Sequence, residues 1–493
     1  MSDSKKTAIS IIGAGIAGPV FALQILSHPT LRKQYIPIIY DKLPPPDDAS
    51  DASSNVRGRL SYAAGAAVAL TSNALFPLYQ LGLKDALHEV SSETTSINVW
   101  RAWSDSKGLK SGIAGPHKWY NIIRNPGWKA ELETNLRVVE RRDLQRLVLE
   151  KVKELGGEVV WNKKLKEIDS LGDSSSSLKL TFGDGTSVTT DLVVGGDGNW
   201  SLVRKFIIQQ QWPDEVKTRW EPEFPFCSGI YGISEKFENA DGKGNEPGDT
   251  HWVLLDQGVA STWALPDGKM FWTISLPEAH PPARSTDLDP SEPQSLYGAD
   301  VSCGGYSFES TVEILRRHEN IFHPFAGTFG AIFKNSSRIV RAPLWHKAWD
   351  VNEIGSNNAV VIGDSSRAML PSSGQGACFA IEDATVLANS LLNNLSSNHE
   401  ILNFKDAISE NANLRVPRSK RMATQSYWTG VVGLAARFWW RWLRDFGSAW
   451  LPLGGDPRVN RNPNAKDPMG WLHDVRYRVE VSQPEEIGDR TTG

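Results

Sequence analysis

The chain has 493 residues. A single hydrophobic core usually supports fewer residues than this, so we expect two or three domains. Hydrophobic residues make up 40% and charged residues 22%, and a formal net charge of −4 gives no general attraction to nucleic acid or to an anionic membrane. The three cysteines are far apart, which predicts neither a disulfide framework nor a metal site and fits a reducing, cytoplasmic setting.

A glycine motif near the start is the first feature with chemical meaning. A β-branched run, 9–12, ends at Gly13, Gly15 and Gly18, spaced G-x-G-x-x-G, and a helix-compatible run follows over 20–26. Gly13 permits a tight turn, Gly15 lets the backbone approach a pyrophosphate, and Gly18 lets the helix pack on the strand. The pattern therefore predicts the opening of a Rossmann unit.

A second strand pattern, 36–40, ends at Asp41. An acid roughly 20 residues beyond the glycines binds the adenosine ribose in such units. A glycine-rich turn without a ligand is the alternative. The strand before the motif, the helix after it and the acid at the end of the second strand favour the nucleotide site.

Further elements follow in order as far as residue 200. A surface loop over 42–55 leads to Arg57 and Arg59, and a helix then ends near Gly82. The next expected elements are a strand at 97–103, an irregular segment to about residue 134, a helix that opens over 138–145, a strand at 159–161, a hairpin over 178–190 and a buried strand from 191 that runs into a glycine turn.

The pattern changes at about residue 205. Strand-like runs at 226–234, 251–255, 260–265 and 270–276 predict a mainly antiparallel sheet, inserted in the first domain. We expect a long loop over 277–307 and a helix over 309–320. The first domain resumes with a strand at 359–364 and a helix after Gly376.

Three signals occur in order along the chain. They are the glycine loop, the turn at Asp197-Gly198 followed by 201–204, and Gly363-Asp364 with the later Gly374-Gln375-Gly376. This set resembles the single-component, class A FAD-dependent monooxygenases, the para-hydroxybenzoate hydroxylase superfamily, over roughly residues 9–392. The run 203–206 and a pair of strands around the turn Pro266-Asp267-Gly268 are also similar to the tetracycline-inactivating monooxygenases.

The resemblance implies an α/β fold with a discontinuous Rossmann-type FAD domain of the glutathione-reductase type. The expected ranges are 1–85, 135–210 and 340–425 for the FAD domain, 86–134 and 211–339 for a β-rich substrate domain, and 426–493 for a helical tail.

The resemblance also implies which residues bind FAD. Asp364 would bind the ribityl chain, and the helix opened by 371–376 would direct its N–H groups and positive dipole end to the flavin pyrimidine edge, favouring the anionic reduced flavin. Asp197 would be linked to FAD and reduced pyridine nucleotide; capping a helix is its alternative role. The expected cofactor-binding residues are Gly13, Gly15, Ala17, Gly18, Asp41, Arg57, Arg59, Arg141, Gln145, Asp197, Asp364, Pro371, Gly374, Gly376 and Ala377.

Two departures from the family pattern bear on the site. Arg367 stands where the family commonly has a histidine, and would either pair with a phosphate or point outward. Tyr231 and Trp263 occupy strand positions where many aromatic hydroxylases have an arginine and a tyrosine, which predicts a more apolar pocket for a larger, neutral, polycyclic molecule. Tyr231, His251 and Trp263 are the pocket candidates, with sheet packing as their alternative role.

The implied activity is an NADPH- or NADH-dependent monooxygenase in natural-product or aromatic metabolism. Hydride would reduce FAD, O₂ would add at flavin C4a, and the (hydro)peroxide would transfer one oxygen to an aromatic or polycyclic substrate. A flavin oxidase, dehydrogenase or halogenase on the same fold is the alternative.

The tail is rich in tryptophan. Val431, Leu434, Ala435, Phe438, Trp442, Phe446 and Trp450 would fall on one helical face, and Arg437, Arg441 and Arg444 on another. Such a helix over 431–450 suits weak membrane contact, and equally suits packing on the substrate domain or on a partner.

Overall fold

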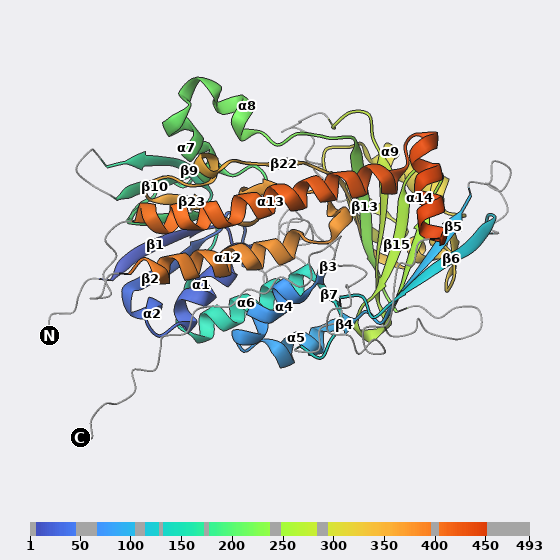
Figure 1. Ribbon diagram of the computed structural model, residues 1–493, viewed down its shortest axis with the longest axis horizontal. Helices are drawn as coiled ribbons and strands as arrows, with labels where there is room; N and C mark the ends of the chain where they lie inside the picture. The colour runs from blue at the N-terminus through green and yellow to red at the C-terminus, as the bar shows by residue number, and fades with distance from the viewer. Residues whose placement is uncertain are drawn as a thin grey trace, which may run out of the picture.

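The computed structural model describes residues 6–45, 67–103, 114–127, 132–171, 177–236, 248–282, 294–395 and 404–450. Arg57 and Arg59 lie outside these ranges, and so does the part of the tail beyond residue 450. Two parts lie side by side in Figure 1, one built on a parallel sheet and the other on a large mixed sheet. The α/β class expected from the sequence is confirmed.

The first part is organised around a five-stranded sheet in which every pairing is parallel. In spatial order its strands are β23 (Ala359–Val361), β12 (Leu192–Gly195), β1 (Thr7–Ile12), β2 (Tyr35–Tyr40) and β8 (Glu158–Val160). Parallel sheets are buried on both faces, and alternate residues of β1 accordingly enter two cores. Ile11 packs in the core that contains α1 (Ala17–Ser27), and Ile12 packs in the core that contains α7 (Leu202–Gln211).

Helices and two small antiparallel sheets complete this part. Five further helices belong to the side of the parallel sheet that carries α1. They are α2 (Leu31–Gln34), α4 (Ser72–Gln80), α5 (Lys84–Val90), α6 (Arg141–Glu154) and α12 (Gly376–Asn393). Near α7 lie η2 (Pro213–Glu215), α8 (Val216–Trp220) and α11 (Val351–Ile354). The small sheets are β3 (Ala67–Leu70), β7 (Arg137–Glu140) and β4 (Ser91–Glu93), and β11 (Ser187–Thr190), β10 (Leu178–Phe182) and β9 (Leu165–Ser170).

The second part is a nine-stranded sheet, antiparallel except where β18 pairs with β21 and β14 with β5. In spatial order its strands are β17 (Gln294–Leu296), β18 (Ala299–Ser302), β21 (Ser336–Pro343), β13 (Cys227–Ser234), β16 (Met270–Pro277), β15 (Val259–Ala264), β14 (Asp249–Leu254), β5 (Ser96–Ala102) and β6 (His117–Arg124). One face packs on α9 (Phe308–His318) and α10 (Phe329–Lys334). Short elements are η3 (Pro266–Gly268), β19 (Phe322–His323), β20 (Gly327–Thr328) and β22 (Lys347–Ala348).

Two segments expected to be irregular contain strands. β6 lies in the segment before residue 134, and β17 and β18 lie in the expected loop over 277–307. β6 shows no buried-exposed alternation, because most of its side chains are exposed or half-buried. Its strand conformation depends on pairing with β5, a long-range contact that a local pattern does not reveal.

Helix α13 (Phe404–Leu434) spans both parts, and α14 (Phe438–Trp450) follows it (Figure 1). The expectation that 431–450 form one helical face is wrong, because the chain turns between the two helices. Ala435 has a φ of 50°, in the left-handed region that ends a helix. The seven apolar residues of the expected stripe are therefore divided between the end of α13, the turn and α14.

A buried charge cluster joins α12 to α13. Asp383 accepts hydrogen bonds from Arg415 Nε at 2.6 Å and from Arg367 Nη1 at 2.7 Å, and Glu382 accepts from both Arg415 and Arg418. The three guanidinium groups surround the ring of Phe379, at 4.7 to 5.2 Å from its centroid. Burial acts to raise the pKa of Asp383, but Arg367 and Arg415 hold it below its usual value.

We expect that replacing one arginine of this cluster will cost far more stability than replacing a lysine of an exposed pair. In Arg415→Met, two buried carboxylates lose a partner, and such losses cost about 3–5 kcal/mol. Lys420 on the same helix pairs with Asp350 in solvent, so Lys420→Met should cost less than about 1 kcal/mol. Urea unfolding measures both, and equal losses would contradict the role given to the cluster.

Candidate functional site

The loop between β1 and α1 can be made only by glycine at two positions. Gly13 has a φ of 108°, and a Cβ there would lie 2.4 Å from the carbonyl oxygen of Gly196. A Cβ on Gly18 would lie 2.1 Å from the Gly13 oxygen. Among the described residues, a Cβ at Gly15 would meet only Arg141 Nη2, at 3.5 Å. Gly13 and Gly18 thus serve close packing, and Gly15 leaves backbone uncovered beside a cation.

Asp41 and Gln145 hold this loop from two sides. Ala14 N donates to Asp41 Oδ2 at 2.6 Å, and Gln145 Nε2 donates to the Ala14 oxygen. The second oxygen of Asp41 accepts from Leu43 N at 2.8 Å. Each carboxylate oxygen has two lone pairs, so Asp41 retains acceptor capacity for a ribose hydroxyl at the end of β2.

Asp364 lies in the turn η4 (Gly363–Ser365), directly after β23. Its side chain is exposed, yet the protein around it raises its pKa by desolvation, against the charges of Arg367 and Arg141. A carboxylate that is reachable from outside and still desolvated lies in a recess of the surface. A Cβ on Gly363 would be 3.0 Å from the Cβ of Ala17, so this turn abuts the first residue of α1.

The start of α12 faces open space. After η5 (Pro371–Ser373), Gly374 adopts a φ of 63°, and α12 begins at Gly376, where a Cβ would meet nothing within 4 Å among the described residues. Gln375 is buried and bonded to Thr71 and Asn73 beside α4. Ala377 is 9% exposed. The helix thus presents uncovered N–H groups, with its orientation fixed from behind.

These features fit FAD. Gly15 and Gly376 expose backbone to a ligand, α12 directs the positive end of its dipole outward, and Asp364 offers a carboxylate to hydroxyl groups. Arg141, the first residue of α6, lies beside Gly15, and its charge opposes the rise in pKa that desolvation causes at both Asp364 and Tyr231. A cation at this place suits a pyrophosphate.

Asp197 binds the first N–H groups of α7, whose N-cap residue is Ser201. Its Oδ2 accepts from Leu202 N at 2.7 Å, and its Oδ1 accepts from the Ser365 hydroxyl at 3.0 Å. Ser365 also accepts from Gly198 N at 2.7 Å. Asp197 therefore joins the start of α7 to the turn that carries Asp364. In this geometry Asp197 supports the position of that turn.

Arg367 adopts neither of the two expected orientations. It is 1% exposed, lies in β24 (Arg367–Ala368), and pairs with Asp383. It does not point outward, and its partner is a carboxylate of the protein. The sequence could not reveal this, because the partners come from α12 and α13.

The three pocket candidates lie on two faces of the large sheet. Tyr231 and Trp263 pack with Phe271 against β3 and β7, the face toward the first part. His251 shares a face with Val253, which packs in the core under α9 and α10. The structure therefore brings Tyr231 and Trp263 together, and His251 does not join them.

His251 contacts a second buried histidine. Its ring lies 5.2 Å from that of His323, edge to face. His323 Nδ1 accepts from the backbone N of Ala326 at 3.0 Å, so Nε2 carries the proton and donates to Thr262 Oγ1 at 2.8 Å. Burial lowers the pKa of His251 to about 4 and that of His323 well below its usual value.

Arg338 is a charged residue of this region that the sequence did not single out. It lies in β21, opposite Ile233 and on the same face as Tyr231. Its buried Nε has no hydrogen-bond partner among the described residues. Desolvation lowers its pKa, and the charge of Glu140 opposes this. A strand pattern over 336–343 could have pointed to this residue. The sequence alone, however, does not show which of the two arginines in that strand faces the interior.

Known proteins similar to this chain are flavin enzymes. No family model matches. The chain is 25% identical over 476 residues to a salicylate hydroxylase of Pseudomonas putida, covering 90% of this chain and 93% of that protein. It is 25% identical over 346 residues to the FAD-dependent monooxygenase pynG of Aspergillus niger, covering 66% and 70%. HpxO of Klebsiella pneumoniae, crystallised with FAD and uric acid, has a TM-score of 0.61 at 16% identity and covers 89% and 93%.

The resemblance to class A FAD-dependent monooxygenases is thereby confirmed. The tetracycline destructase Tet(51) shares the fold, with a TM-score of 0.55 at 14% identity over 90% of this chain and 96% of that one. Within the described ranges, no helix has the length and apolar character that crossing a bilayer requires.

We expect the buried histidines to make the free energy of unfolding fall as the pH is lowered. Both have folded-state pKa values below the unfolded value of about 6.5. Their stabilising effect is therefore complete above pH 6.5 and is lost toward pH 4, by up to about 1.4 kcal/mol per pH unit for each group.

His251→Phe should reduce this slope between pH 4 and 6.5, as urea unfolding across that range measures. The exposed His280, replaced by Gln, is the control and should leave the slope unchanged. An unchanged slope in His251→Phe would show that His251 is not held neutral by burial.

Proposed function

We propose that the chain is an FAD-dependent monooxygenase that uses NAD(P)H and O₂ to insert one oxygen atom into an aromatic or polycyclic small molecule. The observation that carries the proposal is that Gly15 and Asp364 both lie close to Arg141, while α12, which packs on the turn before Asp364, begins at an uncovered Gly376. Similarity along nine-tenths of the chain to a salicylate hydroxylase supports the reaction class.

The residues of the chain have binding and orienting roles in this proposal. When bound, FAD supplies hydride acceptance and the activation of O₂. The loop held by Asp41 and Gln145 would place the pyrophosphate beside Arg141. Asp364 would accept hydrogen bonds from ribityl hydroxyls. The N-terminus of α12 would stabilise negative charge on the pyrimidine edge with its N–H groups.

The reductant and the fate of oxygen separate this proposal from its alternatives. A monooxygenase oxidises NADPH or NADH faster when substrate is present and transfers one atom of labelled O₂ to the product. An oxidase or dehydrogenase transfers none, and a halogenase requires halide. Substrate-stimulated NAD(P)H oxidation, followed by mass spectrometry of the product, makes the distinction.

We expect Asp364→Ala to bind FAD on the order of 10- to 100-fold more weakly, because a charged acceptor of hydroxyl hydrogen bonds is lost. Fluorescence titration of the FAD-free protein measures this. Asp300, exposed on β18, is the matched control, and Asp300→Ala should bind normally. An Asp364→Ala protein that purifies yellow and fully loaded would remove Asp364 from the site.

We further propose that Arg338 gives the substrate region a cation and so favours substrates with an anionic group. The family-like arginine is absent from β13, but Arg338 on the neighbouring strand faces the same side as Tyr231, and both influence each other's pKa. Tyr231 and Trp263 would form the apolar wall beside it. This proposal differs from the more apolar pocket for a neutral molecule that the sequence predicts.

Arg338→Met should weaken salicylate binding about tenfold and change salicylamide binding little, because only salicylate carries a carboxylate. The perturbation of the flavin absorption spectrum measures both dissociation constants in the FAD-loaded protein. Arg317→Met, at an exposed position of α9, is the control. Equal weakening of both ligands would indicate a structural role for Arg338.

A further inference from the structure

Helix α14 is attached to the protein through its polar side. Arg444 is 4% exposed, and its guanidinium donates to the carbonyl oxygens of Leu255 at 2.6 Å, Gly433 at 2.9 Å and Gly258 at 3.2 Å. Asp445 accepts from Arg101 Nε at 2.9 Å. These bonds fix the rotation of the helix about its own axis, so the direction of its opposite face is also fixed.

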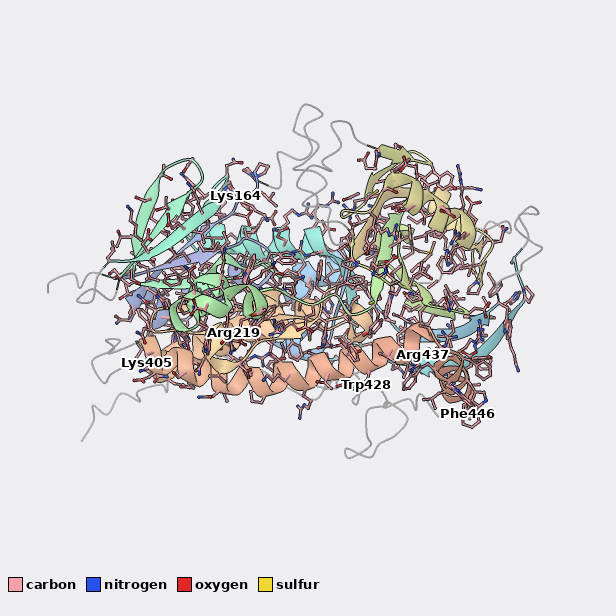
Figure 2. All side chains as sticks on the ribbon, turned by 90° about the horizontal axis from the view of Figure 1, so that it is seen from above. Lys164, Arg219, Lys405, Trp428, Arg437 and Phe446 are labelled. Carbon is pink, nitrogen blue, oxygen red and sulfur yellow. The ribbon has the colours of Figure 1, made fainter. Side chains whose placement is uncertain are left out.

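The opposite face is aromatic and exposed. We call the following six residues the aromatic surface: Trp428 (53% exposed), Phe438 (62%), Trp439 (75%), Trp442 (56%), Leu443 (46%) and Phe446 (50%). They make up half of the large apolar side chains that the described residues expose. The rings of Trp442 and Phe446 stack at 5.5 Å, and Trp428 on α13 lies 6.2 Å from Trp440 on α14. Figure 2 shows Trp428, Arg437 and Phe446 along one edge of the molecule.

Two arginines of α14 and of the turn before it lie beside the aromatic surface. Arg437 is exposed, and Arg441 is half-exposed with its guanidinium 5.8 Å from the centroid of the Phe438 ring. Arg441 Nη1 also lies 3.8 Å from the half-exposed carboxylate of Asp256, which neutralises part of its charge. Asp445 is the only acidic residue within 428–450, and it is turned inward to Arg101 and Arg444. Tryptophan and phenylalanine flanked by arginine are typical of helices that lie in the headgroup region of a membrane.

We propose that the aromatic surface binds the surface of a membrane that contains anionic lipids. The helix has 13 residues, so it is roughly 20 Å long, shorter than the hydrocarbon core of about 30 Å. It would therefore lie in the plane of the interface, with its aromatic side chains among the acyl chains and Arg437 and Arg441 near the phosphates.

A second copy of the chain is a less suitable occupant. Around a two-fold axis through α14, Arg437 and Arg441 would approach their own counterparts, and like charges would face one another. Anionic headgroups instead complement both arginines. The membrane contact does not depend on the proposed activity, because it involves residues outside the candidate flavin site.

Flotation of the full-length protein with vesicles tests the proposal. Wild type should float with phosphatidylcholine–phosphatidylserine vesicles, more weakly with phosphatidylcholine alone, and less as salt rises. The double variant Trp439→Ser, Trp442→Ser should bind on the order of tenfold or more weakly. The control Leu414→Ser, at a 55% exposed position near the other end of α13, should bind as wild type does.

Several outcomes would overturn the proposal. Failure of wild type to bind either vesicle, or equal binding by the double variant, would do so. A dimer in solution that the double variant dissociates, without vesicle binding, would identify a second copy as the occupant. Binding that appears only after deletion of 451–493 would show that this segment covers the surface. Far-ultraviolet circular dichroism and unchanged flavin content verify that the variants fold.

Discussion

The buried pairing of Asp383 with Arg367 and Arg415 is the interaction on which the candidate flavin site depends. Asp383 Oδ2 accepts from Gly363 N at 2.8 Å, so the same carboxylate that binds the arginines also fixes the turn before Asp364. Removing one partner would leave a charge in a medium where it is poorly solvated. Desolvation raises the pKa of Asp364; within the cluster the charge of Arg367 opposes this rise and the charge of Asp383 adds to it.

The same helix pair connects this site to the far end of the molecule. α13 contributes Arg415 and Arg418 to the cluster, and farther along Ser426 Oγ bonds to Ser373 Oγ at 2.6 Å, just before the start of α12. Trp428 follows one helical half-turn later and begins the aromatic surface. One helix therefore contributes to both the support of the candidate cofactor site and the surface proposed to meet lipid.

Local sequence patterns predicted the structural features that depend only on residues close together in the chain. The glycine loop and Asp41 at the end of β2 were predicted from a strand, a tight turn and a helix in succession, whereas Asp364 was predicted from the resemblance to a known family. Residues whose position depends on distant partners were not located. Arg367 meets Asp383 and Arg415 only in the folded chain, and β6 forms a strand only because it pairs with β5. His251 lies on the opposite face of the sheet from Tyr231 and Trp263, and this depends on the strand register.

The flavin released from the purified protein tests the central claim most directly. The protein is denatured, and the released cofactor is identified and quantified against the chain. The account predicts a yellow protein that releases FAD, one molecule per chain after reconstitution, since we propose that the loop beside Arg141 binds the pyrophosphate of a dinucleotide. A colourless protein that cannot be reconstituted with FAD, or one that retains only FMN, would contradict it.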